Sequence, residues 1–179
     1  KLLWDNNRDE AARAGTAMHL DIEKYYNNIP VDNSSIEFSY FKNYHKDFIE
    51  SNPHIVPWRT EMMVWDEEYK LAGSIDMIFI DLNTNELIIV DWKRSKEIKK
   101  INGFGKCGNK MCIEHLPDAN FWHYSLQLGT YKHIIEKNYG KKVKEMYLVC
   151  LHPNNKNKNY LKINVANLDQ EIAELLKLR

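Results

Sequence analysis

The feature that most constrains the fold is a change of hydrophobic period in the middle of the chain. Three short runs rich in Val, Ile, Met, Phe and Trp cover residues 58–65, 71–80 and 87–92. Polar turns at 66–70 and 82–85 separate these runs, a pattern that predicts three strands joined by two hairpins. The runs are too apolar for a sheet open to water on both faces, so we expect helices to cover it.

Helical periodicity precedes and follows these strands. Apolar residues recur at three- and four-residue steps over 9–26, and a capping box, Ser34-Ser35-Ile36-Glu37, predicts a second helix that ends near Glu50. The other expected elements are a helix over 120–139 that ends at Gly140, strands over 143–151 and 160–165, and a helix over 168–178. This order predicts a single α/β domain, residues 1–179, with helices flanking a central mixed sheet.

The chain as a whole fits an intracellular protein. Its 179 residues suffice for one full hydrophobic core, and the start at Lys1 rather than Met leaves room for a longer parent polypeptide. We expect no membrane association, because no apolar run approaches the roughly 18–20 residues of a membrane span and the first ten residues are too polar for a signal peptide. Three cysteines, Cys107, Cys112 and Cys150, are too few for a disulfide framework and favour a reducing compartment.

Two acids and a lysine on the second and third expected strands give the sharpest chemical signal. If the intervening turn centres between Asn83 and Thr84, Asp76 and Asp91 face each other across an antiparallel pair, with Cβ atoms about 4.5–5.5 Å apart. Lys93 lies two residues beyond Asp91, so its side chain points to the same side of the sheet.

Facing carboxylates repel each other and destabilise an ordinary sheet, but a divalent cation reverses the sign of that interaction. Such oxygen ligands suit Mg²⁺ or Mn²⁺, and a neighbouring ammonium stabilises charge on a phosphate. The alternative is an edge hairpin whose acids are merely solvated. The apolar residues around both acids disfavour it, because unpaired buried acids are unfavourable. We therefore expect Asp76, Asp91 and Lys93 to form a catalytic metal site.

Two further residues are candidates for this site. Glu61 opposes Asp76 if the turn at 66–70 is centred, whereas a one-residue shift turns Glu61 to the other face. From the residues alone it is equally a metal ligand or an ordinary surface residue. His19, in Gly15-Thr16-Ala17-Met18-His19, would favour Mn²⁺ or a mixed site, although a lone helical histidine is more often structural.

Substrate contacts are expected on the helix at 120–139. His123, Gln127 and Tyr131 follow one another at four-residue steps, which places them on one stripe of the helix. This stripe offers hydrogen-bond donors and a ring to a DNA strand; alternatively, it is ordinary solvated surface.

The segment at 95–119 has no period and is long for a compact domain, which is typical of functional loops. Between residues 93 and 110 the chain carries seven Lys or Arg residues and one acid, although its total of 25 basic and 25 acidic residues argues against a general nucleic-acid coat protein. We assign phosphate contacts to Arg94, Lys96, Lys99 and Lys100, and base stacking to Phe104. A solvated, flexible loop is the alternative.

The four motifs Gly15-Thr16-x-x-His19, Gly73-x-x-Asp76, Asp91-x-Lys93 and Gln127-x-x-x-Tyr131 together resemble the RecB-type exonuclease branch of the PD-(D/E)xK nuclease superfamily. The resemblance covers about residues 15–151 and extends to mitochondrial genome maintenance exonucleases and to CRISPR adaptation nucleases without an iron–sulfur cluster. It implies a restriction-endonuclease-like α-β-β-β-α-β core. The residue roles that it implies are metal ligation by His19, Asp76, Asp91 and the Trp92 carbonyl, catalysis by Lys93, and substrate contact by Gln127 and Tyr131.

Some members of this branch hold a four-cysteine iron–sulfur cluster, with one cysteine before the histidine motif. This chain has no cysteine before Cys107, so we expect Mg²⁺ or Mn²⁺ and no iron–sulfur cluster. The resemblance implies a deoxyribonuclease of DNA repair, recombination or replication, and a small domain with a basic loop favours an exonuclease on single strands or DNA ends. Two alternatives remain: a catalytically silent nucleic-acid-binding module, and a structure-specific endonuclease domain fused to or associated with a helicase or another repair protein.

Overall fold

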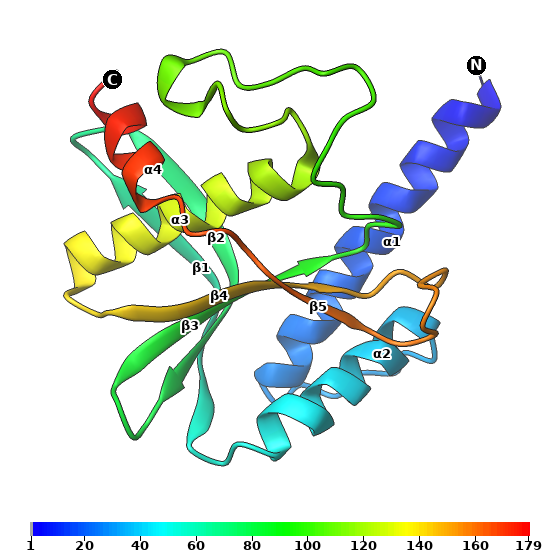
Figure 1. Ribbon diagram of the computed structural model, residues 1–179. Coiled ribbons are helices and arrows are strands. Elements are labelled where there is room, and N and C mark those ends of the chain that lie inside the picture. Colours follow the sequence, from blue (N-terminus) through cyan, green and yellow to red (C-terminus); the bar gives the residue numbers. More distant parts are fainter. Residues whose placement is uncertain (1) are drawn as a thin grey trace.

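The computed structural model describes the backbone of residues 2–179 and the side chains of residues 9–179. Five strands form one mixed sheet in the order β1-β2-β3-β4-β5 (Figure 1). Their bounds are β1 Ile55–Asp66, β2 Leu71–Asp81, β3 Glu86–Lys93, β4 Val143–Cys150 and β5 Leu161–Asn164. Only β3 and β4 pair in parallel among these strands, and their long connection supplies the crossover that parallel neighbours require. The predicted α/β class with a mixed sheet is confirmed.

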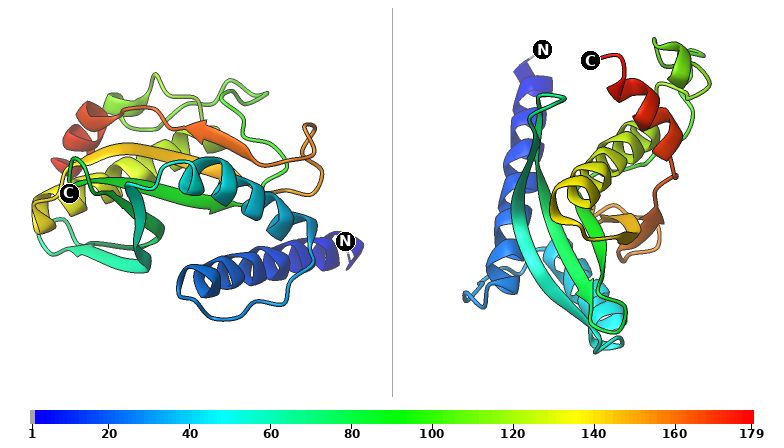
Figure 2. Two further views of the ribbon diagram at one scale, coloured as in Figure 1. Left: turned by 90° about the horizontal axis from the view of Figure 1, so that it is seen from below. Right: turned by 90° about the vertical axis from the view of Figure 1, so that its left-hand side faces the viewer.

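Helices cover both faces of the sheet. One face carries α1 (Leu2–Tyr26) and α2 (Ile36–Tyr44), which continues as a π-helical turn over His45–Glu50; the other carries α3 (Asn120–Tyr139), with α4 (Asp169–Leu176) packed on it (Figure 2). Each interface is a separate apolar core, the first built around Trp92 and Phe41 and the second around Leu128 and Ile135. None of the described helices has the length and apolar character needed to cross a membrane.

Two helix starts differ from the prediction. Helix α1 begins at Leu2 rather than at Asp9, because no glycine or proline interrupts the backbone in that stretch. Helix α2 is capped by Ser35, whose extended backbone lets its Oγ accept a hydrogen bond of 3.1 Å from the Phe38 amide. The predicted capping box at Ser34 is therefore wrong, and Glu37 forms an ion pair with Arg94 at 2.7 Å instead.

The connection over 95–119 has more structure than its sequence predicts. It contains a 3₁₀ turn over Met111–Ile113 and an isolated antiparallel bridge between Cys107 and Pro117. It leaves the end of β3 and returns to the start of α3 (Figure 1). The segment therefore spans between the two elements that carry most of the expected site residues.

Candidate active site

The site forms where the β2–β3 ladder ends. Its last pairs are Ile78 with Ile89 and Met77 with Val90, so the register is the one predicted and Asp76 lies level with Asp91. Asp76 does not continue the ladder with its backbone. Its Oδ2 accepts a hydrogen bond of 2.9 Å from the Trp92 amide instead, which fixes the Asp76 carboxylate beside β3.

Glu61 interrupts β1 at the same level. The β1–β2 pairs on either side of it, Thr60 with Met77 and Met62 with Ile75, have the predicted register, but Glu61 itself has φ +45°. A positive φ is uncommon outside glycine, and such residues concentrate at functional sites. This backbone turns Glu61 toward Asp76, while its Oε2 accepts a hydrogen bond of 3.2 Å from the Ser74 hydroxyl.

His19 reaches this point from α1. Its Nδ1 lies 3.5 Å from Asp76 Oδ2 and 3.9 Å from Glu61 Oε1. One ligand atom from each of the three residues lies within 4.8 Å of the other two, a spacing that one metal ion can bridge. Burial lowers the pKa of His19, which favours the neutral ring that a metal requires. The backbone of Trp92 acts against the effect of burial on the His19 pKa, so the predicted carbonyl ligand is near the ring.

The Asp91 carboxylate is drawn toward Lys93 rather than into this three-residue cluster. Lys93 Nζ lies 2.7 Å from Asp91 Oδ2, and Asp91 is only 5% exposed. Burial lowers the pKa of Lys93, but the Asp91 carboxylate outweighs it, and the pKa of Lys93 is raised overall. The lysine is therefore charged and held at the mouth of the site.

Too much negative charge is buried here for the one lysine to neutralise. Burial and then the neighbouring Asp91 raise the pKa of Asp76 to about 8. Burial also raises the pKa of Asp91, against the opposing effect of Lys93. Carboxylates whose environment penalises their charged form are the groups that a cation stabilises most. The donor set of one imidazole and clustered carboxylates therefore fits Mg²⁺ or Mn²⁺.

Helix α3 forms a wall over the site. A Cβ at Gly73 would lie 2.6 Å from Cε1 of Tyr131, so only glycine permits this ring to lie directly on β2. Gln127 Nε2 donates a hydrogen bond of 3.1 Å to the Tyr131 hydroxyl. The structure thus brings Gln127 and Tyr131 to the site. His123 pairs with Asp118 at 2.8 Å near the start of the helix and remains exposed.

Sequence reasoning missed one residue of this wall. Lys93 Nζ lies 4.5 Å from the ring centroid of Tyr124, a cation–π contact. Tyr124 precedes Gln127 by three residues and Tyr131 by seven, so helical periodicity alone places it on their face.

The four predicted phosphate-binding residues divide into two groups. Arg94 is half-buried and forms an ion pair with Glu37. Lys96, Lys99 and Lys100 are exposed on the segment that leaves β3. The site also opens to solvent beside α1, in a hollow lined by His19, Glu61, Gly15 and Thr16 among others.

A solved structure and a protein family match this chain. One matching solved structure is that of a protein from Eubacterium rectale described as a candidate exonuclease; it is 14% identical, has a TM-score of 0.39, and the match covers 88% of this chain and 69% of that one. No curated protein matches the chain. The family described as the PD-(D/E)XK nuclease superfamily matches residues 34–178, and the mixed sheet flanked by helices has the restriction-endonuclease-like fold of that family. The chain therefore belongs to the PD-(D/E)XK nuclease superfamily.

Proposed function

We propose that this protein is a metal-dependent nuclease of the RecB-type branch that hydrolyses DNA phosphodiester bonds. One observation carries the proposal: His19, Glu61 and Asp76, from three different elements, converge within 4.8 Å beside the ion pair of buried Asp91 with half-buried Lys93. Residues so far apart in sequence meet here against their mutual repulsion, which is expected where a ligand supplies the missing charge.

The metal would be held by His19, Asp76 and Glu61, with Asp91 and the Trp92 carbonyl adjacent. His19 precedes the region matched by the family, so its role is supported by its distances to the two acids. When bound, Mg²⁺ or Mn²⁺ lowers the pKa of water and polarises a phosphoryl oxygen.

The protein's own groups then orient the phosphate. The Lys93 ammonium contacts Asp91 and the Tyr124 ring, and it lies on the same side of the sheet as Asp91. There it stabilises the charge that develops on a phosphate oxygen. Tyr131 and Gln127 present a hydroxyl and an amide to the strand being cut. Attack by water forms one P–O bond and breaks the bond to the 3′ oxygen, leaving a 5′-phosphate and a 3′-hydroxyl.

We further propose a preference for single-stranded DNA and exonuclease action in DNA repair, recombination or replication. Exposed lysines on the segment that follows Lys93 support a nucleic-acid path that starts at the site. Parallel digestion of 5′- and 3′-labelled oligonucleotides would establish polarity. A closed circular single strand, which an exonuclease leaves intact, would distinguish exonuclease from endonuclease action.

The decisive test is cleavage of defined DNA by wild type and Asp91→Ala at increasing Mn²⁺. We expect wild-type cleavage to require the metal, and the variant to lose cleavage while retaining most of its DNA binding. Full activity of Asp91→Ala would refute the assignment. Binding without metal-dependent cleavage in the wild type would instead indicate a catalytically silent module.

Metal binding has an independent readout in thermal stability. Mn²⁺ at about 100 times its dissociation constant contributes about 2.7 kcal/mol of stability, which is about 5–10 °C in melting temperature for a chain of this size. The same addition should leave Asp76→Asn nearly unchanged. A wild-type melting temperature insensitive to millimolar Mn²⁺ would refute the metal site.

A further inference from the structure

The segment over 95–119 exposes large apolar side chains of a kind that proteins usually bury. Phe104 is 88% exposed, the highest value for a large apolar side chain among residues 9–179, and Ile101 in the same loop is 74% exposed. An exposed phenylalanine gains nothing for folding, since burial is what makes it stabilising. The loop is therefore a candidate contact surface.

The backbone around Phe104 is hydrogen-bonded to one side chain, that of Asn102. Asn102 Oδ1 accepts hydrogen bonds from the Phe104 amide at 2.9 Å and the Lys106 amide at 3.0 Å. Its Nδ2 donates to the carbonyls of Lys106 and Asp118. Phe104 is thus presented on a fixed loop, which reduces the entropy lost when a partner binds.

The base of this loop is attached to the active-site helix. The Lys99 amide donates to Asn120 Oδ1 at 2.7 Å, its carbonyl accepts from the Phe121 amide at 3.1 Å, and the Lys100 carbonyl accepts from Trp122 Nε1 at 2.8 Å. The same helix carries Gln127 and Tyr131 further along. The loop therefore begins at the end of β3, beside Lys93, and is anchored where α3 starts to cover the site (Figure 1).

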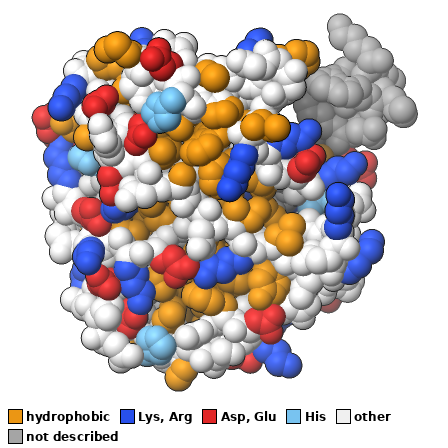
Figure 3. All heavy atoms as spheres, in the orientation of Figure 1, with side chains coloured by type: hydrophobic (Ala, Val, Ile, Leu, Met, Phe, Trp, Pro, Cys, Tyr) orange, Lys and Arg blue, Asp and Glu red, His pale blue; other side chains and the backbone are white. Residues whose placement is uncertain are grey.

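The charge around Phe104 suits a polyanion. Lys99, Lys100 and Lys106 surround it in sequence, and all three are exposed. Glu97 is the one acid of residues 93–110, and it pairs with Lys99 at 3.4 Å. Hydrophobic and basic side chains lie next to each other along the upper margin of the molecule, where Figure 1 places this segment (Figure 3).

We propose that Phe104 is a stacking platform for an unpaired base, and that the lysines beside it bind the adjoining phosphates. This inference rests on the proposed nuclease function, because it supplies the means by which that site selects single strands. The faces of bases are covered in a duplex and available in a single strand. A protein partner would gain the apolar contact but not the phosphate contacts that this lysine pattern offers.

The test is a double-mutant cycle in which the Phe104 ring is removed from the protein and the bases are removed from the DNA, separately and together. Binding is measured by fluorescence anisotropy with the intact chain in EDTA, using a labelled single strand of about 12 nucleotides and its abasic counterpart, which keeps every phosphate. Phe104→Leu should weaken binding of the normal strand about tenfold and of the abasic strand less than about twofold, given that a stacked base contributes about 1–3 kcal/mol. Phe104→Trp should bind the normal strand at least as well as wild type.

A matched control is Met111→Ala, which removes another side chain of the same segment that is 85% exposed. It should leave both affinities unchanged. Lys99→Gln with Lys100→Gln should weaken both strands equally and reduce the salt dependence of log K by about 0.7 for each lost contact.

Equal affinity of Phe104→Leu and wild type for the normal strand would overturn the proposal and indicate a protein-binding surface. Equal weakening on normal and abasic strands would overturn it too, since the ring would then not act through a base. No step of this assay needs hydrolysis, so absence of metal-dependent cleavage would refute the proposed function alone.

Discussion

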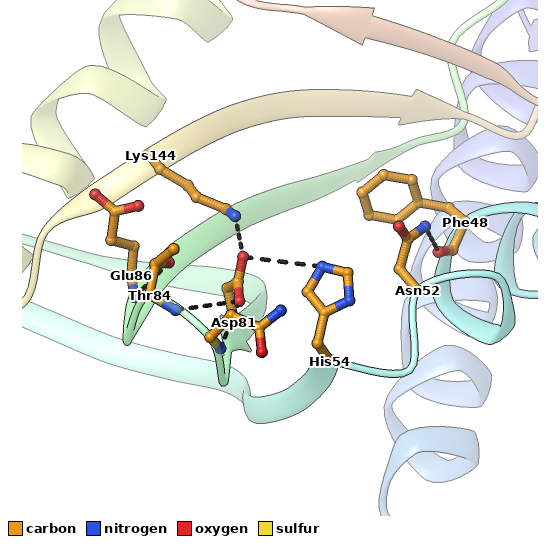
Figure 4. A network of polar contacts seen from close by, with 8 residues as sticks. Phe48, Asn52, His54, Asp81, Thr84, Glu86 and Lys144 are labelled. Carbon is orange, nitrogen blue, oxygen red and sulfur yellow. Dashed lines mark hydrogen bonds and ion pairs between the residues drawn. The ribbon is translucent and has the colours of Figure 1, made fainter.

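The β2–β3 hairpin has a buried acid at each end, and the two ends are opposite in electrostatics. At the turn, Asp81 is 3% exposed and fully supplied with partners (Figure 4). Its Oδ1 accepts hydrogen bonds from the Asn83 amide at 2.8 Å and the Thr84 amide at 3.4 Å, while its Oδ2 pairs with the Lys144 ammonium and lies 4.0 Å from His54 Nε2. The hydrogen bond from Lys144 is the main reason that the pKa of Asp81 lies below its ordinary value.

At the other end, the acids face each other. Asp76 and Asp91 share one lysine and one backbone amide between them, and Glu61 adds a third carboxylate. Burial and this crowding raise the pKa of Asp76 to about 8. The fold thus satisfies the acid at the turn and leaves the acids at the open end without enough partners to neutralise them. A buried carboxylate without sufficient partners is a sign of a ligand site, whereas burial alone is not.

The largest expected contrast between the two ends is in catalysis. Asp76→Asn should reduce the cleavage rate at least about a thousandfold, because metal-mediated charge stabilisation is worth several kcal/mol. Asp81→Asn should leave the rate per folded molecule within about twofold of wild type. The measurement is the initial cleavage rate of both variants on one labelled oligonucleotide at saturating Mn²⁺. Comparable losses in the two variants would mean that Asp76 and Asp81 do not differ in their importance for catalysis.

Stability should show the reverse contrast. In EDTA, Asp81→Ala should lower the melting temperature by about 5 °C, because it leaves two turn amides and Lys144 without their acceptor. Asp76→Asn should leave the melting temperature unchanged or raise it, as is common when a functional site is relieved of repulsion. The measurement is thermal unfolding followed by circular dichroism.

A matched control is Asp169→Ala, which breaks the exposed pair between Asp169 and Lys132. Exposed pairs contribute roughly 0–1 kcal/mol, so its melting temperature should change by about 2 °C at most. An Asp81→Ala variant as stable as this control would show that the turn does not need its acid.

The sequence predicted the β2–β3 register, with Asp76 opposite Asp91, and gave the observed β1–β2 register as one of two alternatives. The constraint is local, because short turns and a two-residue side-chain period decide which residues oppose each other. The positive φ of Glu61 was not predictable, since glutamate has no preference for this backbone conformation.

Contacts between distant segments were beyond sequence reasoning. Arg94 was expected to bind phosphate, but a partner 57 residues away, Glu37, occupies it. The order of the loop after Lys93 depends on the side-chain hydrogen bonds of Asn102, which no periodicity records. Hydrophobic periodicity predicted which face of a strand or helix a residue lies on. It did not predict which side chain from a distant segment contacts that residue.

A smaller contrast is expected in the pH dependence of the metal-free protein. Asp76 has a folded-state pKa of about 8, above its unfolded value of about 4, so stability should fall as pH rises between these values. The groups that face Asp76 are the same in the wild type and in Asp76→Asn; they are Asp91, Glu61, Lys93 and His19. As pH rises from 5 to 8 in EDTA, the melting temperature of the wild type should therefore fall relative to that of Asp76→Asn.

Asp81 should contribute with the opposite sign. Its folded-state pKa lies below the unfolded value, so its stabilising effect is present above about pH 4 and is lost as pH falls further. Asp81→Asn should therefore reduce acid sensitivity below pH 4 and leave the slope between pH 5 and pH 8 unchanged. A slope between pH 5 and pH 8 that responds to Asp81→Asn and not to Asp76→Asn would reverse the assignment of the two acids.

The smallest expected effect concerns the packing of Tyr131, on α3, against Gly73 of β2 at the open end of the hairpin. In Gly73→Ala the new Cβ would lie 2.6–3.0 Å from the outer ring atoms of Tyr131, which can swing away more easily than the sheet can move. The variant should therefore fold normally, with cleavage reduced about tenfold, because small displacements at a reacting centre lower rates strongly.

The two residues should then behave as one unit. If Gly73→Ala acts by displacing the ring, adding it to Tyr131→Ala should reduce cleavage no further, since the contact is already gone. Multiplying losses in the double variant would mean that Gly73 acts through the backbone of β2 and so through Asp76. That outcome would place the sensitivity of the open end in its strands, whereas the expected non-additive cycle places it in the aromatic wall above them.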